Sequence, residues 1–356
     1  IYPGPAAIVP GRDIAPDGAT IALADYRARY ASYRRCPDLL ALHARLPVLA
    51  VWDDHEFADN ARRDGAWNHD SASEGDWEAR KAAALKAWLD WMPVTRAGVW
   101  QDHRIGTLAT LFSLETRITG RTASPDLYGH ARDSGDLADF AGNAWRDPRW
   151  RILGADQEAW LAGGLARSAA GQPWQVLLQS VPMGHAVLPP AALDWRANGG
   201  AEAQQEVAML VEAGRHSIPF NMDNWGGFPA QRSRLLASAQ AARANLIVTS
   251  GDSHNGWGYE LAHAGRPAGV ELAVPSVSSP GFETWFPDTA PDAVAAALIA
   301  GNSELVVAET ATRGYGTLLL TPEVAELAWH FTGSPRTRSP VVARSIRRQV
   351  AAGTNR

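Results

Sequence analysis

The stretch that decides the fold class is Val48-Leu49-Ala50-Val51-Trp52, followed at once by Asp53-Asp54-His55-Glu56. A short apolar run of this kind is typical of a strand that is buried on both faces. Ionisable residues directly after it would lie at the carboxyl end of the strand, where the loops of open α/β sheets gather around ligands. The sequence therefore predicts an α/β protein with a ligand site at this strand end.

Two more predicted strands also end in polar residues. Residues 105–114 alternate as a strand does and end on Glu115-Thr116-Arg117, and Leu246-Ile247-Val248 leads into Gly251-Asp252-Ser253-His254. Hydrophobic spacing predicts helices between the strands, at residues 25–45, 77–91, 155–166 and 230–241. Further strands are predicted at residues 174–178, 259–262, 270–274, 305–308, 316–320 and 324–331. The simplest interpretation is one α/β domain.

Composition limits the classes of function. The chain has 356 residues, of which 46% are hydrophobic, and carries 33 basic and 38 acidic residues. Without a Lys/Arg block, we expect no nucleic-acid-binding surface, and without an apolar run of about 18 residues we expect no transmembrane segment. The single cysteine, Cys36, allows no intramolecular disulfide, and we expect it to be buried in a helix and inert. Residues 335–356 are predicted to form a basic C-terminal tail or helix outside a domain of residues 1–334.

The acidic residues after the strands indicate a metal site. Adjacent negative charges behind a buried strand are unfavourable unless a cation or a set of donors offsets them. Asp252 and His254 offer an oxygen and a nitrogen ligand on a tight turn, which suits iron, manganese or zinc. Two such clusters predict a two-metal site. A helix N-cap for the first cluster and an ordinary turn for the second remain the alternatives.

Several segments together resemble a known family. Besides the two polar clusters, these are Tyr26-Arg27-Ala28-Arg29-Tyr30, Leu114-Glu115-Thr116-Arg117, Leu153-Gly154-Ala155-Asp156-Gln157 and Asn224-Trp225-Gly226-Gly227-Phe228-Pro229. They resemble the alkaline phosphatase D (PhoD)-like family of the calcineurin-like metallophosphoesterase superfamily. The resemblance implies an α/β/β/α sandwich of two sheets. It also implies metal-dependent hydrolysis of phosphate esters, as an alkaline phosphatase or phosphodiesterase, by a metal-bound hydroxide.

The resemblance assigns roles to individual residues. The positions that match metal ligands are Tyr2, Asp53, Asp54, Asp252 and His254. His55 matches the histidine that polarises the phosphate or protonates the leaving group, and Arg117 is placed to clamp a phosphate oxygen or to form a surface salt bridge. The family usually has aspartate where this chain has Glu115. The implied cofactor is a binuclear or multinuclear centre of Fe³⁺ with Ca²⁺, with Mn²⁺ or Zn²⁺ as alternatives.

The beginning of the chain carries a further expectation. Ile1-Tyr2 fits the last two positions of a Gly-Asp-x-x-Tyr element, so we expect an N-terminally truncated chain that lacks its first strand or strands. The resemblance also implies a small phosphorylated substrate and a periplasmic or secreted location. Two alternatives stay open: a phosphodiesterase acting on phospholipids or wall polymers, and a catalytically inactive fragment that only binds phosphate.

Overall fold

The chain divides into two compact units rather than the single predicted domain. The computed structural model describes residues 14–94, 100–334, 337 and 341–355. The first unit, here called the helical unit, comprises residues 1–101 and 115–122, and the second, the sheet unit, comprises residues 102–114 and 123–356. Residues 115–122 belong to the helical unit, where Ile118 packs into a hydrophobic core of its own.

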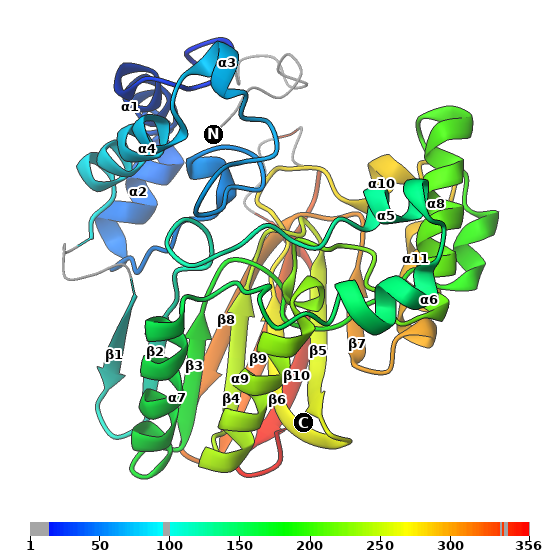
Figure 1. Ribbon diagram of the computed structural model, residues 1–356. Helices are drawn as coiled ribbons and strands as arrows, with labels where there is room; N and C mark the ends of the chain where they lie inside the picture. Colours follow the sequence, from blue (N-terminus) through cyan, green and yellow to red (C-terminus); the bar gives the residue numbers. More distant parts are fainter. Residues whose placement is uncertain (1–13, 95–99, 335–336, 338–340, 356) are drawn as a thin grey trace. The chain divides into compact units, whose positions relative to one another are not determined.

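The helical unit is built around aromatic side chains. Its elements are α1 (Leu23–Tyr33), α2 (Pro37–Arg45), the 3₁₀ turn η1 (Asp54–Glu56), α3 (Ser71–Glu74) and α4 (Trp77–Trp91). Its core includes Tyr26, Trp52, Phe57, Trp77 and Trp88. Helix α4 begins where it does because the Asp76 carboxylate accepts a hydrogen bond from the Ala79 N–H at 3.0 Å. Figure 1 shows α1, α2 and α4 grouped in this unit.

Two predictions for the helical unit are wrong. Residues 48–52 form no strand but an extended segment that leads into η1, with Trp52 buried and Leu49 exposed. No strand of the described part of this unit lies beside the segment to share its backbone hydrogen bonds, so the apolar run is used for side-chain packing instead. The predicted helix 25–45 is two helices, and Cys36, which precedes α2, is exposed rather than buried.

A seven-stranded sheet forms the centre of the sheet unit. Its order is β1-β2-β3-β4-β6-β5-β7, and the neighbours from β2 to β6 run parallel, whereas β5 pairs antiparallel with β6 and β7. The strands are β1 (Gln101–Ile105), β2 (Ala109–Ser113), β3 (Trp174–Leu178), β4 (Leu246–Ser250), β5 (Gly256–His263), β6 (Arg266–Ala273) and β7 (Leu305–Glu309). The apolar run before the Gly-Asp-Ser-His motif is therefore a central parallel strand, as predicted.

A second, antiparallel sheet has the order β10-β9-β8. It contains β8 (Gly314–Leu320), β9 (Val324–Thr332) and β10 (Val342–Ala351). The expectation of a tail or helix after residue 334 is wrong for residues 342–351, which pair along the length of β9. The polar residues of β10 hid the strand, because β10 is an edge strand and most of its side chains are exposed.

The two sheets pack face to face, which confirms the predicted mixed α/β fold with two sheets. Ile247 and Leu272 of the large sheet share one core with Leu327, Trp329 and Phe331 of β9. Helices α7 and α9 cover the other face of the large sheet (Figure 1). The remaining helical elements are α5 (Leu127–Asp133), α6 (Leu137–Asp139), η2 (Phe140–Ala144), α7 (Ala155–Ala169), η3 (Pro190–Asp194), α8 (Gly200–Arg215), η4 (Trp225–Gly227), α9 (Pro229–Ala242), α10 (Phe282–Trp285) and α11 (Pro291–Gly301).

Candidate metal centre

In the helical unit, the turn η1 holds its acidic residues by bonds to backbone N–H groups. The Asp54 carboxylate accepts hydrogen bonds from the N–H groups of His55 and Asn60, both at 2.8 Å. The Glu56 carboxylate accepts one from the Asp53 N–H at 2.7 Å. Burial raises the pKa of the Glu56 carboxyl, and the charges of Asp53 and Asp54 act in the same direction. The capping acid that the sequence left open as an alternative is thus present as Glu56, while the N–H groups of His55 and Asn60 fix the side chain of Asp54.

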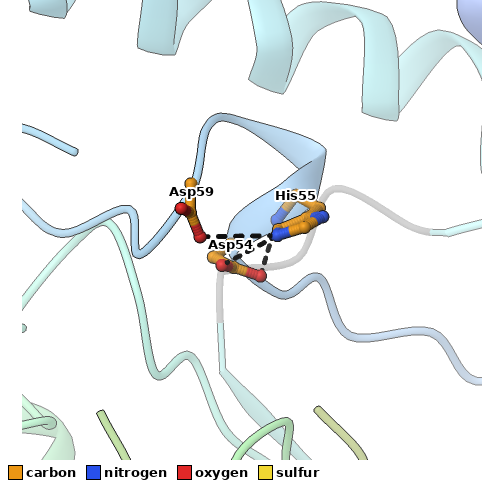
Figure 2. A group of neighbouring side chains, drawn as sticks. All are labelled: Asp54, His55 and Asp59. Carbon is orange, nitrogen blue, oxygen red and sulfur yellow. Dashed lines mark hydrogen bonds and ion pairs between the residues drawn. The ribbon is translucent and has the colours of Figure 1, made fainter. Parts of the chain in front are cut away.

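Three side chains of the helical unit form a cluster that suits a metal ion. In Figure 2 the carboxylates of Asp54 and Asp59 and the imidazole of His55 point toward one another. His55 Nε2 lies 3.4 Å from Asp54 Oδ2 and 3.6 Å from Asp59 Oδ1. One ligand atom from each residue lies within 4.8 Å of the others. Two carboxylate oxygens and an imidazole nitrogen fit iron, manganese or zinc.

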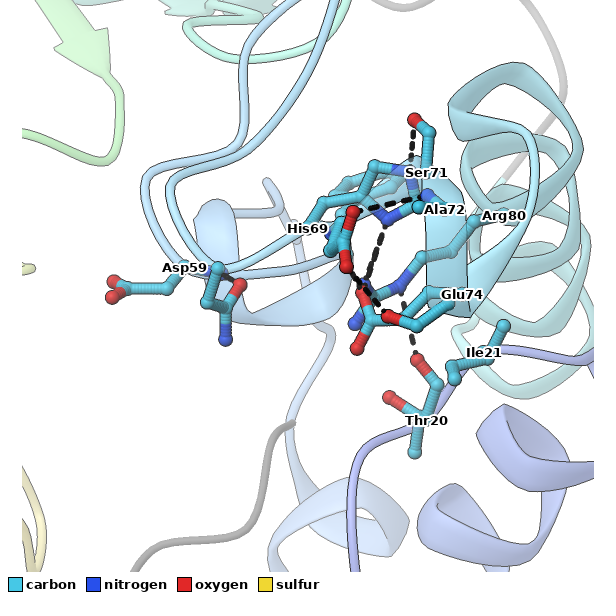
Figure 3. Close-up of polar contacts among 12 residues, drawn as sticks. Thr20, Ile21, Asp59, His69, Ser71, Ala72, Glu74 and Arg80 are labelled. Atoms are coloured by element: carbon cyan, nitrogen blue, oxygen red, sulfur yellow. Dashed lines mark hydrogen bonds and ion pairs between the residues drawn. The ribbon is translucent and has the colours of Figure 1, made fainter.

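Asp59 was missed by the sequence analysis. Its only signal is the spacing of four residues from His55, and no regular helix connects the two residues. The Asp59 N–H donates to the Asn68 side chain at 3.0 Å. The residues after Asn68 form a polar network in which Arg80 donates to Glu74 at 2.7 Å and lies 3.1 Å from His69 (Figure 3). The long loop between η1 and α4 therefore holds Asp59 in place.

Arg117 is a partner of the predicted metal ligands. Its Nε lies 2.6 Å from Asp53 Oδ1, and its Nη2 lies 4.0 Å from Asp54 Oδ1. The Arg117 side chain is fully buried. Of the two roles that the sequence left open for Arg117, the salt bridge is therefore present, but it is a buried one. A buried guanidinium beside adjacent aspartates offsets part of their mutual repulsion.

Glu115 fixes the loop that carries Arg117. Its buried carboxylate accepts hydrogen bonds from the Trp52 indole at 2.8 Å and from the N–H groups of Arg117 at 2.7 Å and Ile118 at 2.8 Å. The N–H of Thr119 donates to it at 2.8 Å, and the Thr119 hydroxyl donates as well. The carboxylate thus joins the segment before η1 to residues 117–119. This side chain is an anchor of the helical unit.

In the sheet unit, the Gly251-Asp252-Ser253-His254 motif forms a strained turn at the end of β4. The Ser253 N–H donates to the Gly251 carbonyl at 2.7 Å, which closes a three-residue turn around Asp252. Asp252 and His254 have φ values of 62° and 61°, in the left-handed region that side-chain-bearing residues rarely adopt. Such strain persists only where the surroundings impose it, and it concentrates at functional sites.

The imidazole of His254 has a defined orientation. Its Nδ1 lies 2.8 Å from the Pro280 carbonyl oxygen. Because a carbonyl oxygen only accepts, Nδ1 carries the proton of this hydrogen bond and the Nε2 of a neutral imidazole keeps its lone pair. This is the arrangement in which a histidine binds a metal through Nε2.

A buried carboxylate lies directly behind this turn. Glu271 of β6 accepts hydrogen bonds from the Ser250 hydroxyl at 2.6 Å and from the N–H groups of Met183 at 2.8 Å and Gly184 at 2.6 Å. Burial raises the pKa of Glu271 to about 7. Glu271 therefore joins the end of β4 to the loop that follows β3.

Comparison with known proteins decides the family. A family model described as PhoD-like phosphatase matches residues 5–329. The chain belongs to the PhoD-like phosphatase family. The resemblance drawn from the sequence motifs is thereby confirmed.

Two PhoD proteins are among the relatives. Alkaline phosphatase D of Bacillus subtilis (strain 168) is 28% identical over 275 residues, which cover 73% of this chain and 41% of that protein. A solved structure of PhoD matches with a TM-score of 0.72 at 22% identity, covering 100% of this chain and 63% of that one. The two chains share their fold, and this chain spans less than half of the B. subtilis protein.

The structure describes all of the predicted metal ligands except one. Tyr2 lies outside the described residues. Asp54 and His55 fall in one cluster with Asp59, whereas Asp252 and His254 lie on the turn after β4. Family membership and the cluster together indicate a metal centre. Among the described residues, no helix has the length and apolar character needed to cross a membrane.

Proposed function

We propose that this PhoD-like chain hydrolyses phosphate esters with the help of bound metal ions. The observation that carries the proposal is the Asp54, His55 and Asp59 cluster of a PhoD-like chain, because it places two carboxylates that can bind a metal beside an imidazole that can contact the phosphate ester. Asp252 and His254 are the proposed ligands of the sheet unit. Iron with calcium is the proposed metal content, with manganese or zinc as alternatives.

The bound cations would neutralise charge on the phosphoryl group and activate water at neutral pH. The protein contributes the placement of the groups around them. Asp54 is proposed to bind metal with a carboxylate that two backbone N–H groups already orient. Arg117 is proposed to orient Asp53 and to offset its charge through their contact of 2.6 Å.

His55 is proposed to hydrogen-bond the phosphoryl group or to give a proton to the leaving oxygen. Its imidazole is about 40% exposed, so a substrate can reach it. Its Nε2 lies 3.4 Å from Asp54 Oδ2 and 3.6 Å from Asp59 Oδ1, so the imidazole lies beside the two carboxylates of the cluster. The proposed location, periplasmic or secreted, rests on family resemblance alone.

The test combines metal content with hydrolysis of a monoester and a diester, p-nitrophenyl phosphate and bis-p-nitrophenyl phosphate. Asp54→Asn and His254→Ala should lose metal and activity together. His55→Ala should keep most of its metal and lower kcat by about 10²–10⁴-fold, because a proton donor acts on the transition state. His216→Ala is the matched control, since His216 also pairs with a carboxylate four residues away, Glu212 at 4.0 Å.

Wild-type levels of hydrolysis in His55→Ala would contradict the role of His55. Metal binding without hydrolysis of either ester, across iron, calcium, manganese and zinc, would instead support the alternative of a chain that only binds phosphate. Faster hydrolysis of the diester than of the monoester would favour the phosphodiesterase alternative.

A further inference from the structure

We propose that Asn255 is a positioning residue that holds the imidazole of His254 in its metal-binding orientation. The inference rests on the proposed role of His254 as a ligand. Asn255 follows His254 directly and precedes β5, and its side chain is 3% exposed. Sequence patterns gave it no role.

The Asn255 side chain joins two segments that meet at His254. Its Nδ2 donates to the Ser253 carbonyl at 2.6 Å, which holds the strained turn. Its Oδ1 accepts from the Phe282 N–H at 3.1 Å. Phe282 is two residues from Pro280, whose carbonyl accepts the proton of His254 Nδ1. One amide therefore fixes the distance between the imidazole and its acceptor.

The segment that Asn255 holds is itself anchored. The Phe282 ring packs edge-on against Phe220 and Trp257, with ring centroids 5.7 and 5.8 Å away. These contacts place the Phe282 N–H independently of the turn. Without Asn255, the turn would keep its connection to β4 and β5 but would lose its side-chain bond to the Phe282 segment.

Gly281 makes the contact with Asn255 possible. A Cβ atom on Gly281 would lie 2.3 Å from Asn255 Oδ1 and 3.2 Å from Glu283 Oε2. No side chain fits at that separation, so the chain needs glycine there. Gly281→Ala therefore disturbs the same contact from the opposite side and leaves Asn255 in place.

Loss of the contact should free the imidazole without removing it. The Nδ1–H tautomer would no longer be imposed by Pro280, and the ring could rotate away from its metal-binding orientation. Removing a hydrogen-bonding partner behind a ligand typically weakens metal binding by about 10–100-fold. We expect an effect of this size for Asn255→Ala and Gly281→Ala.

The test measures the His254 tautomer and Mn²⁺ affinity, neither of which requires hydrolysis. Proton–nitrogen NMR of metal-free protein with isotope-labelled histidine reports the tautomer, and His254→Ala identifies the signals. Asn302→Ala is the matched control: Asn302 is also buried, donates to the Val187 carbonyl at 3.0 Å and accepts from the Val187 N–H at 2.6 Å. Thermal melting verifies that each variant is folded.

The expected result is a wild-type His254 spectrum with Nδ1 protonated, a mixture of tautomers in Asn255→Ala and Gly281→Ala, and a wild-type spectrum in Asn302→Ala. The Mn²⁺ Kd should rise about 10–100-fold in the first two variants alone. An unchanged tautomer in both variants, or an equal rise of the Kd in Asn302→Ala, overturns the inference. A changed tautomer in a protein that hydrolyses no phosphate ester supports it while the proposed function fails.

Discussion

The turn after Trp52 and the turn after Ser250 both hold aspartate and histidine side chains, but different structural elements hold the two turns in place. In the helical unit, the segment before η1 is held by the Trp52 indole, which donates to Glu115, and the Asp54 carboxylate is held by the backbone N–H groups of His55 and Asn60. In the sheet unit, the turn follows a central strand, and its strain is imposed by the sheet on one side and by Asn255 on the other. Acidic side chains can thus be placed by hydrogen bonds from a turn or by a strand end, and substitutions should affect the two supports differently.

Removal of the Glu115 carboxylate is expected to have the largest effect. Glu115→Ala leaves buried N–H and indole donors without an acceptor, so we expect a loss of about 3–5 kcal/mol in the free energy of unfolding. Urea denaturation measures this loss. Glu115→Gln keeps an acceptor oxygen and should lose less, which makes it the variant to use if Glu115→Ala does not fold.

The matched control for this prediction is Glu78→Ala. Its carboxylate makes a surface pair with Lys81 at 2.7 Å, and such pairs contribute about 0–1 kcal/mol. A Glu115→Ala protein as stable as the Glu78→Ala protein would show that the helical unit does not depend on this anchor.

The support of the β4 turn should depend on pH through Glu271. Its pKa is about 7 in the folded protein, above the ordinary value of 4.5. The folded state therefore binds the extra proton between these values. The contribution of Glu271 to the free energy of unfolding is therefore fully present below about pH 4.5 and is lost as the pH rises through about 7. Two and a half pKa units correspond to about 3 kcal/mol.

The measurement is the difference in unfolding free energy between the wild type and Glu271→Gln from pH 4.5 to 7.5. Subtracting the Glu271→Gln values removes the contribution of His185, which also titrates. Burial lowers the pKa of His185 to about 4, so its contribution to the free energy of unfolding is lost as the pH falls. Arg232 and Tyr259 also interact electrostatically with Glu271. Glu260→Gln, an exposed site on β5, is the control. A difference that stays constant with pH contradicts the prediction.

Paired substitutions should give the smallest effect, with opposite signs in the two turns. At position 252, Gly should be more stable than Ala by about 1 kcal/mol in metal-free protein, because only Gly adopts positive φ without cost. At position 54, inside the 3₁₀ turn, Ala should be more stable than Gly by about 0.5–1 kcal/mol. Thermal melting of the four variants measures both differences. The same sign at both positions would show that backbone strain does not distinguish the turns.

Most strands of the sheet unit, and its helices α7 and α9, could be predicted. Residues 174–178 form β3 within the predicted limits, and Pro229 opens α9 at the expected first turn. Long apolar runs and regular periods are local signals, and in this unit the tertiary structure agrees with them. Helices α8 and α11 and strand β1 were not predicted, and neither was β10, where exposure on an edge removes the apolar pattern.

The motifs of the candidate site could be predicted from the sequence, but the contacts between its side chains could not. The sequence identified two short motifs with possible metal ligands, one with Asp54 and His55 and one with Asp252 and His254. It gave no sign of Asp59 or Asn255, since their partners lie on loops without a regular period. Arg117, predicted as a phosphate clamp or a salt-bridge partner, contacts Asp53, which lies 64 positions away in the chain.

The sequence by itself determined the PhoD-like family and the two-sheet α/β class, and it predicted which residues could bind a metal. Only the tertiary structure decided that residues 48–52 are not a strand, that the chain forms two units and that Glu115 and Asn255 hold the two turns. The physical reason is that a strand needs a neighbour and a buried polar group needs a partner. Both are supplied by segments far away in the chain, such as Glu115 for Trp52, 63 residues apart.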